Sequence, residues 1–395
     1  MAPFLSCHQP HSLQEPPDDR GCSHPRRGGL TRAALVRFHR YAALGAGVLV
    51  VLVTLAGASL VFRDALTAWF TPRVVIAPRV APPGAYQRML DQARSLEPAA
   101  ASLEIVPSAQ VDRAAEVILK GPRGERHLFL DPYDAAVVAD SEREWLPFAT
   151  LFRLHKTLLA GERGEYAVAV AGLTLTFLAA TGLFLWWPRQ WKRALRVRWD
   201  GNRLAVSYDL HKAAGALFAL FLLFNALTGI VLVFDDSAAR VVNFIARSPP
   251  TGRIEMPPIA GTVKPLDELV AAADRAFPGG RVSRIVVREG AAVMVRKRAE
   301  RDNDTHGMNR ILVNPVTGAV LRTVALDGLP PGNAMFEWIY PLHTGNLLGT
   351  PYKAVLALAG LVPLLSLVTG LIVWRSRAAA RRVAAREPVR ASNTA

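Results

Sequence analysis

The chain contains an internal duplication, and this repeat limits the architectures that it can adopt. Leu154-His155 and Leu342-His343 each open a long apolar stretch in which the same residues recur at the same distances from the histidine. A glycine lies six residues after each histidine, a Thr-Gly pair 26 and 27 residues after it, and a tryptophan 31 residues after it. A register kept over this length predicts two copies of one structural unit.

A second pair of histidines repeats in the same way. His39 and His211 are each followed by a glycine at 18 residues, by Leu-Val-Phe at 21 to 23 and by an aspartate at 25. Each copy therefore carries two apolar stretches, and each stretch begins at a histidine.

Four apolar runs are long enough to cross a lipid bilayer, which takes about 20 helical residues. They cover residues 42–62, 166–187, 213–234 and 353–374. They predict a membrane protein with four transmembrane helices that arose by tandem duplication. Since the N-terminal residues lack a short apolar region with a small-residue cleavage site, we expect no cleaved signal peptide.

The net charge of +15 is compatible with a nucleic-acid partner, but the placement of the basic residues predicts membrane topology instead. Basic residues gather before the first run, between the second and third, and after the fourth. They are Arg20, Arg26, Arg27, Arg32, Arg37 and Arg40; Arg189, Lys192, Arg193, Arg196, Arg198 and Arg203; and Arg375, Arg377, Arg381, Arg382, Arg386 and Arg390. Because such residues mark cytoplasmic flanks, we expect both termini in the cytoplasm, in a multi-pass protein of the bacterial inner membrane that binds no nucleic acid.

These boundaries divide the chain into nine expected segments. They are a disordered cytoplasmic tail (1–36), a first transmembrane segment (37–63), a periplasmic domain (64–150), a second transmembrane segment (151–188), a cytoplasmic loop (189–209), a third transmembrane segment (210–235), a second periplasmic domain (236–341), a fourth transmembrane segment (342–376) and a C-terminal cytoplasmic tail (377–395).

Each periplasmic segment has a helical stretch, at 86–96 and at 266–276, followed by strand-like runs. This order predicts two small α+β domains. In the cytoplasmic loop, Asp200-Gly201-Asn202 lies between two strand-like runs, and we interpret it as a hairpin turn. His127 and His306, in the periplasmic segments, are interpreted as ordinary polar residues.

The N-terminal tail carries Cys7, His8, His11, Cys22 and His24. Their spacing fits no standard zinc pattern, and a tail without a metal is the favoured interpretation. Because the chain has no other cysteine, no disulfide is expected in the periplasmic domains.

The four histidines at the starts of the runs predict a cofactor site. Each copy begins on the same side of the membrane, so the copies are expected to be parallel and related by an axis along the membrane normal. His39 should then face His211 near the inner surface, and His155 should face His343 near the outer surface. Facing imidazoles are the usual axial ligands of a haem iron in a helical bundle, whereas two histidines alone do not complete a zinc tetrahedron. No Cys-x-x-Cys-His motif occurs, so we predict two bis-histidine haems of the b type. The ordinary alternative is four interfacial polar residues.

Cations and glycines adjoin these histidines. Arg40, Lys156 and Lys212 are candidates to pair with haem propionates, although long cations at helix ends also occur without a ligand. Several nearby glycines would allow a porphyrin to approach the backbone or would simply let helices pack closely; they are Gly45, Gly161, Gly215 and Gly349.

Aromatic residues precede the two outer histidines. Trp145, Trp338 and Tyr340 are candidate contacts for an electron acceptor in the cleft between the two periplasmic domains. An aromatic belt at the membrane surface is the alternative interpretation.

These motifs resemble the PepSY-associated transmembrane-helix family over about residues 35–377. The resemblance rests on His39-Arg40, Leu154–Gly161, Asp209–Lys212 and Leu342–Gly345, and on turns at Asp131-Pro132 and at residues 314–318 that resemble the PepSY turn. It implies PepSY-like periplasmic domains and an inner-membrane protein tied to iron uptake, with a di-haem ferric-siderophore reductase as the closest functional analogy. The N-terminal tail lies outside this pattern.

The leading hypothesis is therefore an oxidoreductase, a transmembrane di-haem b reductase. A ferric siderophore is the first candidate among periplasmic oxidants, because reduction to Fe(II) weakens binding by hard oxygen ligands. The electron donor is expected to be a quinol or a separate cytoplasmic protein, since the glycines at Gly45-Ala46-Gly47 lie within an apolar run and form no nucleotide-binding motif. The alternatives are a haem-free scaffold that regulates a protease or binds a peptide, and a carrier for haem or metal.

Overall fold

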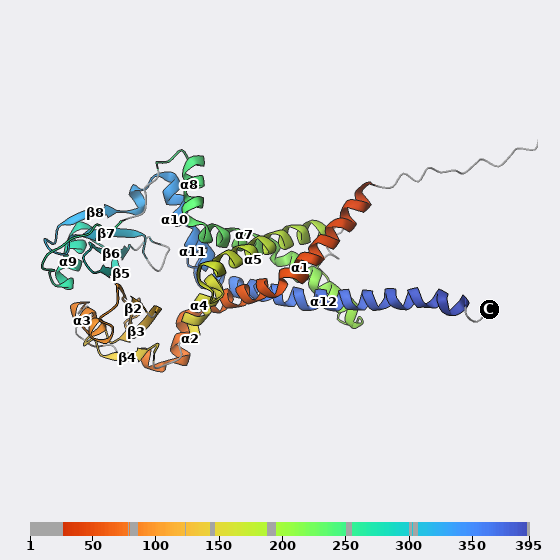
Figure 1. Cartoon of the computed structure of the whole chain (residues 1–395), viewed down its shortest axis with the longest axis horizontal. Helices are drawn as coiled ribbons and strands as arrows, with labels where there is room; N and C mark the ends of the chain where they lie inside the picture. The colour runs from red at the N-terminus through yellow and green to blue at the C-terminus, as the bar shows by residue number, and fades with distance from the viewer. Residues whose placement is uncertain are drawn as a thin grey trace, which may run out of the picture.

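The computed structural model describes residues 27–77, 79, 86–122, 124–142, 147–187, 195–249, 255–299, 302 and 307–392. The cysteines and histidines of the N-terminal tail, together with Trp145 and His306, lie outside the described residues. A bundle of long helices forms one part of the molecule, and a β-sheet with short helices forms the other (Figure 1).

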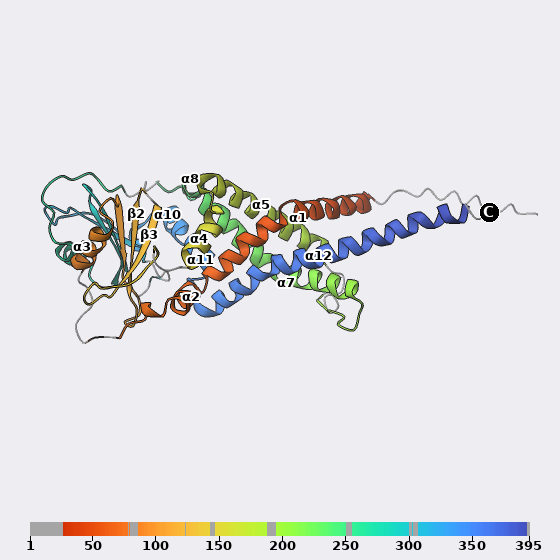
Figure 2. The same ribbon diagram turned by 60° about the horizontal axis from the view of Figure 1, so that its bottom comes forward.

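The described residues contain four helices that are long and apolar enough to span a membrane, as expected. They are α1 (Arg27–Leu60), α5 (Gly161–Trp186), α7 (Arg203–Val233) and α12 (Gly349–Ser392). Helix α12 continues well past Trp374, the last residue of the predicted span, and Figure 2 shows its C-terminal half leaving the bundle.

The predicted hairpin in the cytoplasmic loop is wrong. Residues from Arg203 onward form the first turn of α7, and the side chain of Asn202 accepts a hydrogen bond from Ala205 N at 2.9 Å. Asparagine is a strong N-cap residue because its side-chain oxygen satisfies a backbone N–H that the helix leaves free. The same residue type favours turns, and this explains the misinterpretation.

The four long helices pack in a ring, in the order α1, α5, α7, α12. Contacts α1–α5 and α7–α12 lie within one copy of the duplication, whereas α5–α7 and α1–α12 join the two copies. Small residues permit the close approach between copies: a Cβ added at Gly360 would lie 2.5 Å from the Cβ of Ala58, and one at Gly172 would lie 2.9 Å from Ile230. In a bilayer such close packing is a main source of helix association.

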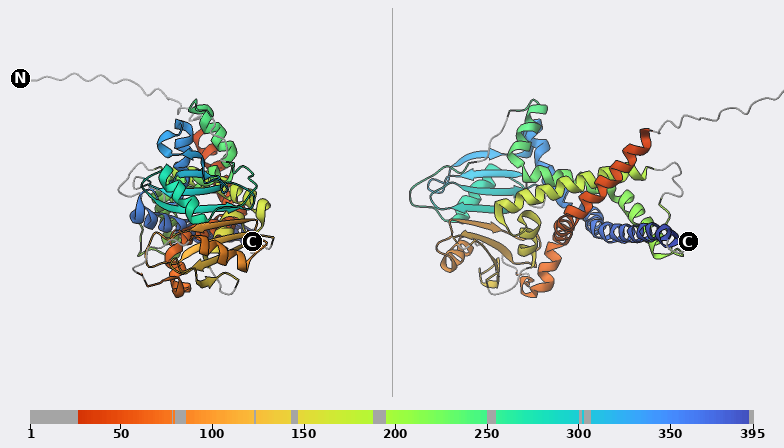
Figure 3. Two further views of the ribbon diagram at one scale, coloured as in Figure 1. Left: turned by 90° about the vertical axis from the view of Figure 1, so that its left-hand side faces the viewer. Right: turned by 45° about the vertical axis from the view of Figure 1, so that its right-hand side comes forward.

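The segments that follow α1 and α7 together form one antiparallel sheet of eight strands, in the order β4-β3-β2-β1-β5-β6-β7-β8. The strands are β1 (Ser102–Val106), β2 (Ala115–Gly121), β3 (Gly124–Leu130), β4 (Val137–Asp140), β5 (Arg281–Arg288), β6 (Val293–Arg298), β7 (Asn309–Val313) and β8 (Val320–Val324). Strands β1 and β5 pair edge to edge with Ile105 opposite Ile285, so the two halves make a single layer (Figure 3).

Helices α3 (Tyr86–Leu96) and α9 (Leu266–Ala276) cover the face of the sheet that points away from the bundle (Figure 1). Alternate strand residues face these helices and form the main hydrophobic core, which runs through both halves. The halves also cap each other's helices. The carboxylate of Asp267 accepts hydrogen bonds from Tyr86 N and Gln87 N, at 2.9 and 3.2 Å, and the Gln87 side chain accepts one from Leu266 N at 2.7 Å.

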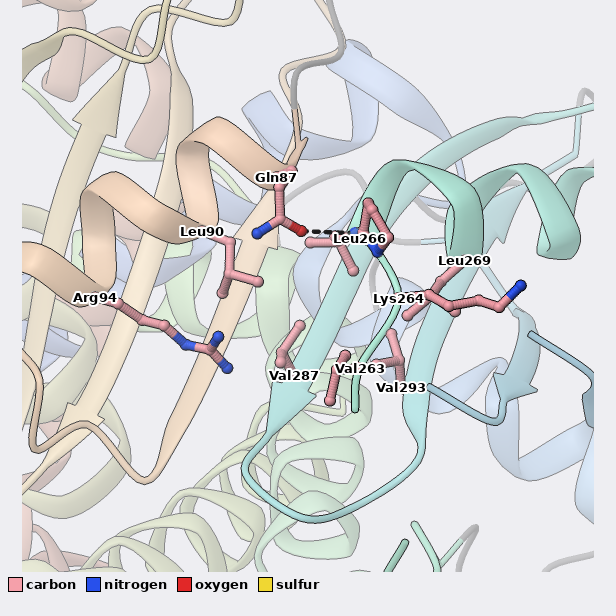
Figure 4. A pocket seen from close by; sticks show the side chains of 10 residues that line it. Gln87, Leu90, Arg94, Val263, Lys264, Leu266, Leu269, Val287 and Val293 are labelled. Atoms are coloured by element: carbon pink, nitrogen blue, oxygen red, sulfur yellow. Dashed lines mark hydrogen bonds between the residues drawn. The ribbon is translucent and has the colours of Figure 1, made fainter. Parts of the chain in front are cut away.

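A pocket of about 330 Å³ lies at this seam, between α3 and α9 (Figure 4). Leu90, Leu266 and Val287 form its apolar wall, and Arg94 and Lys264 line it as well. The pocket therefore lies on the face of the sheet that points away from the bundle. The predicted cleft between two separate domains is thus replaced by a paired seam, because β1 and β5 supply each other's edge hydrogen bonds.

Short helices connect the sheet to the bundle. They are α2 (Arg63–Phe70), η1 (Pro72–Val74) and α4 (Pro147–Thr157) in the first copy, and α8 (Asp235–Ile245), η2 (Leu326–Gly328), α10 (Pro331–Glu337) and α11 (Ile339–Thr344) in the second. Helix α4 packs on α1 and α5, and α11 packs on α7.

The seam provides a test of the shared core. Ile105 is fully buried in β1, and we expect Ile105→Ala to destabilise the sheet by about 2–5 kcal/mol, because a large-to-small change in a core leaves a cavity. Amide hydrogen exchange in the detergent-solubilised protein should accelerate in β5 as well as in β1, by roughly thirtyfold or more. Val111→Ala, at an exposed site, is the control. Acceleration confined to the first copy would contradict a common core.

Candidate functional site

The structure brings the four repeated histidines together in two pairs. The ring centroids of His39 and His211 are 6.4 Å apart, with ring planes at 81°. Those of His155 and His343 are 6.0 Å apart, with planes at 34°. The first pair, the sheet-distal pair, joins α1 to α7; the second, the sheet-proximal pair, joins α4 to α11. The predicted proximity within each pair is confirmed.

The sheet-proximal histidines do not lie on the spanning helices themselves. His155 is near the end of α4 and His343 near the end of α11. The chain then turns through left-handed backbone, at Leu158 and Leu159 with φ of 48° and 62°, and at Gly345 with φ of 79°. A left-handed conformation is costly for leucine, and it places each ring beside a helix of its own copy.

Hydrogen bonds fix the rings of the sheet-distal pair. His39 Nδ1 lies 2.7 Å from Thr181 Oγ1, and that hydroxyl donates to Phe177 O at 2.6 Å, so it accepts from Nδ1–H. His211 Nδ1 donates to the carbonyl of Ser366 at 2.9 Å and lies 3.3 Å from Thr369 Oγ1. A neutral imidazole that donates from Nδ1 leaves Nε2 as its free basic nitrogen.

The sheet-proximal pair is fixed in the same way. His155 Nδ1 donates to Val53 O at 2.8 Å. His343 Nδ1 is 3.2 Å from Asn225 O and 3.1 Å from Thr228 Oγ1. All four rings therefore use Nδ1 for a protein hydrogen bond, which leaves Nε2 as the basic ring nitrogen. This is the usual arrangement of metal-binding histidines, in which the second nitrogen sets the tautomer and the ring orientation.

Each ring also lies on a glycine. A Cβ added at Gly57 would be 2.7 Å from His155 Cε1, and one at Gly229 would be 3.0 Å from His343 Cε1. At Gly182 and Gly370 the corresponding distances to His39 and His211 are 3.5 and 3.4 Å. The repeated glycines are therefore seats for the imidazoles, and they are tighter in the sheet-proximal pair.

The repeat that opens the sequence thus has a structural explanation. The Thr-Gly pair that follows the second histidine of a copy holds the first histidine of that copy, as Thr181 and Gly182 do for His39. Likewise Gly57, which follows His39, seats His155. Sequence reasoning missed these positioning roles, although the shared offsets were the signal.

The three candidate cations differ in their surroundings. Lys156 pairs with Glu165 at 3.3 Å, and Lys212 with Asp209 at 3.3 Å. Arg40 lies over the ring of Tyr41 at 4.9 Å, and its Nε is buried without an acceptor among the described residues. Arg40 is therefore the candidate whose charge the described residues leave most available.

The predicted acceptor contacts lie beside the sheet-proximal pair. Trp338 ends α10 and precedes α11, and Tyr340 lies in α11, three residues before His343. Tyr340 is 40% exposed, so part of this residue is accessible from outside the protein.

Within the described residues, no group of three or more His, Cys, Asp or Glu side chains is placed to hold a metal ion. Each site therefore offers two imidazole ligands only, and a metal there needs a ligand that supplies the remaining positions.

The glycines named from the sequence fall into two groups. Gly161 and Gly349 have φ of 57° and 70° and begin α5 and α12, so left-handed backbone explains them. A Cβ at Gly45 or Gly215 would meet nothing within 4 Å. These two glycines border open space on α1 and α7.

In a comparison with protein families, residues 36–377 match the PepSY-associated TM region. The matched residues include all four paired histidines and the whole eight-stranded sheet. A search of curated proteins finds no match.

A buried ion network anchors α4, the helix that carries His155. Glu116 in β2 contacts Arg63 of α2 at 2.6 Å and His127 Nδ1 at 2.8 Å. The ring centroids of Phe148, in α4, and His127 are 5.6 Å apart. Arg63 lies over the Phe148 ring, with its Cζ atom 4.9 Å from the ring centroid. The sequence interpretation of His127 as an ordinary polar residue overlooked this link between the sheet and the helix.

Glu116 makes this anchor pH-dependent. Burial alone would raise its pKa, but Arg63 and His127 outweigh burial and hold the pKa below the ordinary value. A carboxylate with a lowered pKa stabilises the fold above its unfolded pKa of about 4.3, and the contribution is lost as the pH falls through the folded pKa.

We expect Glu116→Gln to cost about 1–3 kcal/mol at pH 7, because it removes charged hydrogen bonds from a buried site. The difference from the unmodified protein should shrink as the pH falls below about 4. Thermal unfolding of the solubilised protein between pH 3 and pH 7 measures it, with Glu125→Gln, half exposed at the edge of β3, as the control. An equal loss of stability at every pH would contradict the role of the carboxylate charge.

Proposed function

The chain belongs to the family of the PepSY-associated TM region, and we propose that it is a transmembrane oxidoreductase with a haem b held at each histidine pair. The observation that carries this proposal is the geometry of the pairs: two imidazoles face each other at each end, with Nδ1 engaged by the protein in all four.

The spacing of the rings fits a metal ion between them. Imidazole nitrogens lie about 2.0–2.1 Å from a first-row metal, and each nitrogen is about 1.2 Å from its ring centroid, so two axial imidazoles have centroids roughly 6.5 Å apart. The observed separations are 6.4 and 6.0 Å.

At each pair, a bound haem would supply a one-electron carrier. The residues of the chain do the positioning. Val53, Asn225 and Ser366 accept from Nδ1 and make the rings more basic toward a ligand at Nε2. Arg40 adjoins His39 and is available to an acidic group of the cofactor.

The two pairs are far enough apart to bridge the membrane. His39 and Gly57, the seat of His155, are 18 residues apart on α1, and this spacing corresponds to roughly 27 Å along a helix. His211 and Gly229 have the same spacing on α7. A histidine pair near each end of the transmembrane helices suits electron transfer across the membrane. A receptor or a membrane anchor would need no such histidine pairs.

We assign the sheet-distal pair to the cytoplasmic side, following the positive-inside pattern. The donor is a quinol or a separate electron-transfer protein, and the acceptor a periplasmic ferric siderophore. One electron reduces Fe(III) to Fe(II), which hard oxygen ligands bind less tightly. Tyr340 and Trp338, next to His343, are the proposed acceptor contacts.

The seam pocket favours one alternative. Its apolar wall and its two cations, Arg94 and Lys264, suit an anionic peptide, and a haem-free scaffold would use this site and leave the histidines as packing residues. Visible absorption distinguishes the two functions.

We expect the protein purified from membranes to show Soret and α bands that sharpen on reduction with dithionite, with two haems per chain. His155→Ala should lose one haem and keep the other, because the pairs share no ligand, and His39→Ala should lose the complementary haem. Val111→Ala, at an exposed site far from both pairs in the sequence, should retain two. A protein without haem, or one that loses both haems with either substitution, would contradict separate bis-histidine sites.

The glycine seats predict a difference between the pairs. Gly57→Ala places a methyl group 2.7 Å from the His155 ring, whereas Gly182→Ala places one 3.5 Å from His39, an ordinary contact. We therefore expect Gly57→Ala to halve the haem content or to shift one α band, and Gly182→Ala to leave the spectrum unchanged. Haem assay and reduced-minus-oxidised spectra measure this. Equal effects of the two substitutions would show that the distance between the glycine and the imidazole does not control the position of the histidine ring.

A further inference from the structure

A basic pocket is lined by residues of α1 and α12. The N-terminal part of α1 and the C-terminal part of α12 lie at the end of the bundle away from the sheet (Figure 2). Its volume is about 480 Å³. The lining residues come from both copies of the duplication and are four arginines with two small apolar residues: Arg32, Ala33, Val36, Arg37, Arg40 and Arg381.

The charges of this pocket lack carboxylate partners within the described part of the chain. Arg32 donates to the carbonyl of Leu185 at 2.7 Å, which leaves its charge uncompensated. Arg37 and Arg381 form no ion pair there, and the Nε of Arg40 is buried without an acceptor. By contrast, Arg198 at the same end of the bundle pairs with Asp209 at 2.7 Å.

The exposed guanidinium groups of Arg32, Arg37 and Arg381 surround one concavity. Neighbouring cations repel each other, so an anion bound between them is favourable. Guanidinium groups favour phosphate, whose oxygens accept two parallel N–H bonds. A pocket of this size admits a phosphodiester with its glycerol group.

The position of the pocket indicates that the phosphate belongs to a lipid. Arg37 and Arg40 lie within one turn of His39, at the basic end of the spans, where headgroups are found. Beside them on α1, Val36, Phe38 and Tyr41 are 45%, 66% and 60% exposed and offer an apolar surface to acyl chains. Basic pockets between transmembrane helices are known to bind anionic headgroups.

We propose that Arg32, Arg37 and Arg381 in this pocket bind the headgroup of one anionic phospholipid and thereby join α1 of the first copy to α12 of the second, while Arg40, next to His39, stays available to the haem proposed above. The lipid neighbours His39, and its binding does not depend on a haem.

The test is a titration of delipidated protein in neutral detergent with dioleoyl phosphatidylglycerol, followed by native mass spectrometry. We expect one phosphatidylglycerol per chain to be retained, and dioleoyl phosphatidylcholine not to be. Arg37→Gln/Arg381→Gln should weaken retention about 25-fold, since each guanidinium near an anionic headgroup contributes roughly a factor of five. The matched control is Arg196→Gln/Arg382→Gln, which removes the same charge at the same end from exposed sites outside the pocket, and it should bind normally.

Four results would overturn the proposal. Equal retention of phosphatidylcholine, or equal weakening in the control, would show attraction to bulk charge only. Displacement of the lipid by millimolar inorganic phosphate would show a site for free phosphate. Loss of lipid binding in His39→Ala would show that the pocket serves the haem proposed above. If the glutamine variant does not fold, Arg37→Lys/Arg381→Lys keeps the charge and should still select phosphatidylglycerol, with weaker retention because lysine lacks the planar fork.

Discussion

The hydrogen bond from each histidine Nδ1 to another helix of its own copy is the interaction on which both imidazole pairs depend. His39 is held by Thr181 of α5, and His155 by Val53 of α1. Each copy therefore orients its own two imidazole rings through contacts that do not involve the other copy. A glycine beneath each ring removes the side chain that would push it away. Ring position is thus a property of local packing within a copy, and pairing follows when the copies associate.

The two copies contact each other both in the helical bundle and in the sheet. In the bundle, α5 packs on α7 and α1 packs on α12; in the sheet, β1 pairs with β5. The α5–α7 and α1–α12 contacts are equivalent to each other, and β1 and β5 are equivalent strands, as a two-fold axis requires. The axis passes between His39 and His211 and between His155 and His343, so the sheet seam and the histidine pairs share one symmetry. Continuous strand pairing in the sheet sets where α4 and α11 enter the bundle, and Glu116 secures the first of these entries.

The sequence was sufficient to predict the four spans and the partners within each histidine pair, because the repeat offsets extend over whole helices. It was not sufficient for the single sheet, since the Ile105–Ile285 pairing joins residues far apart in the chain and two separate domains would carry the same strand pattern. It misplaced His155, because left-handed backbone at Leu158 and Leu159 is held by tertiary packing and has no glycine to signal it. Asparagine suits both turns and helix N-caps; the sequence pattern predicted a turn at Asn202, whereas this residue caps α7.

The two-fold arrangement of a single chain has a consequence for how the sites can differ. Two separate identical subunits would be forced to have four histidines in two symmetric environments, and their assembly would depend on concentration. Fusion removes both constraints. His39 uses a hydroxyl where its counterpart His211 uses a carbonyl, and α12 carries a long extension that α5 lacks. The covalent link therefore permits the halves to specialise while the stoichiometry stays one to one.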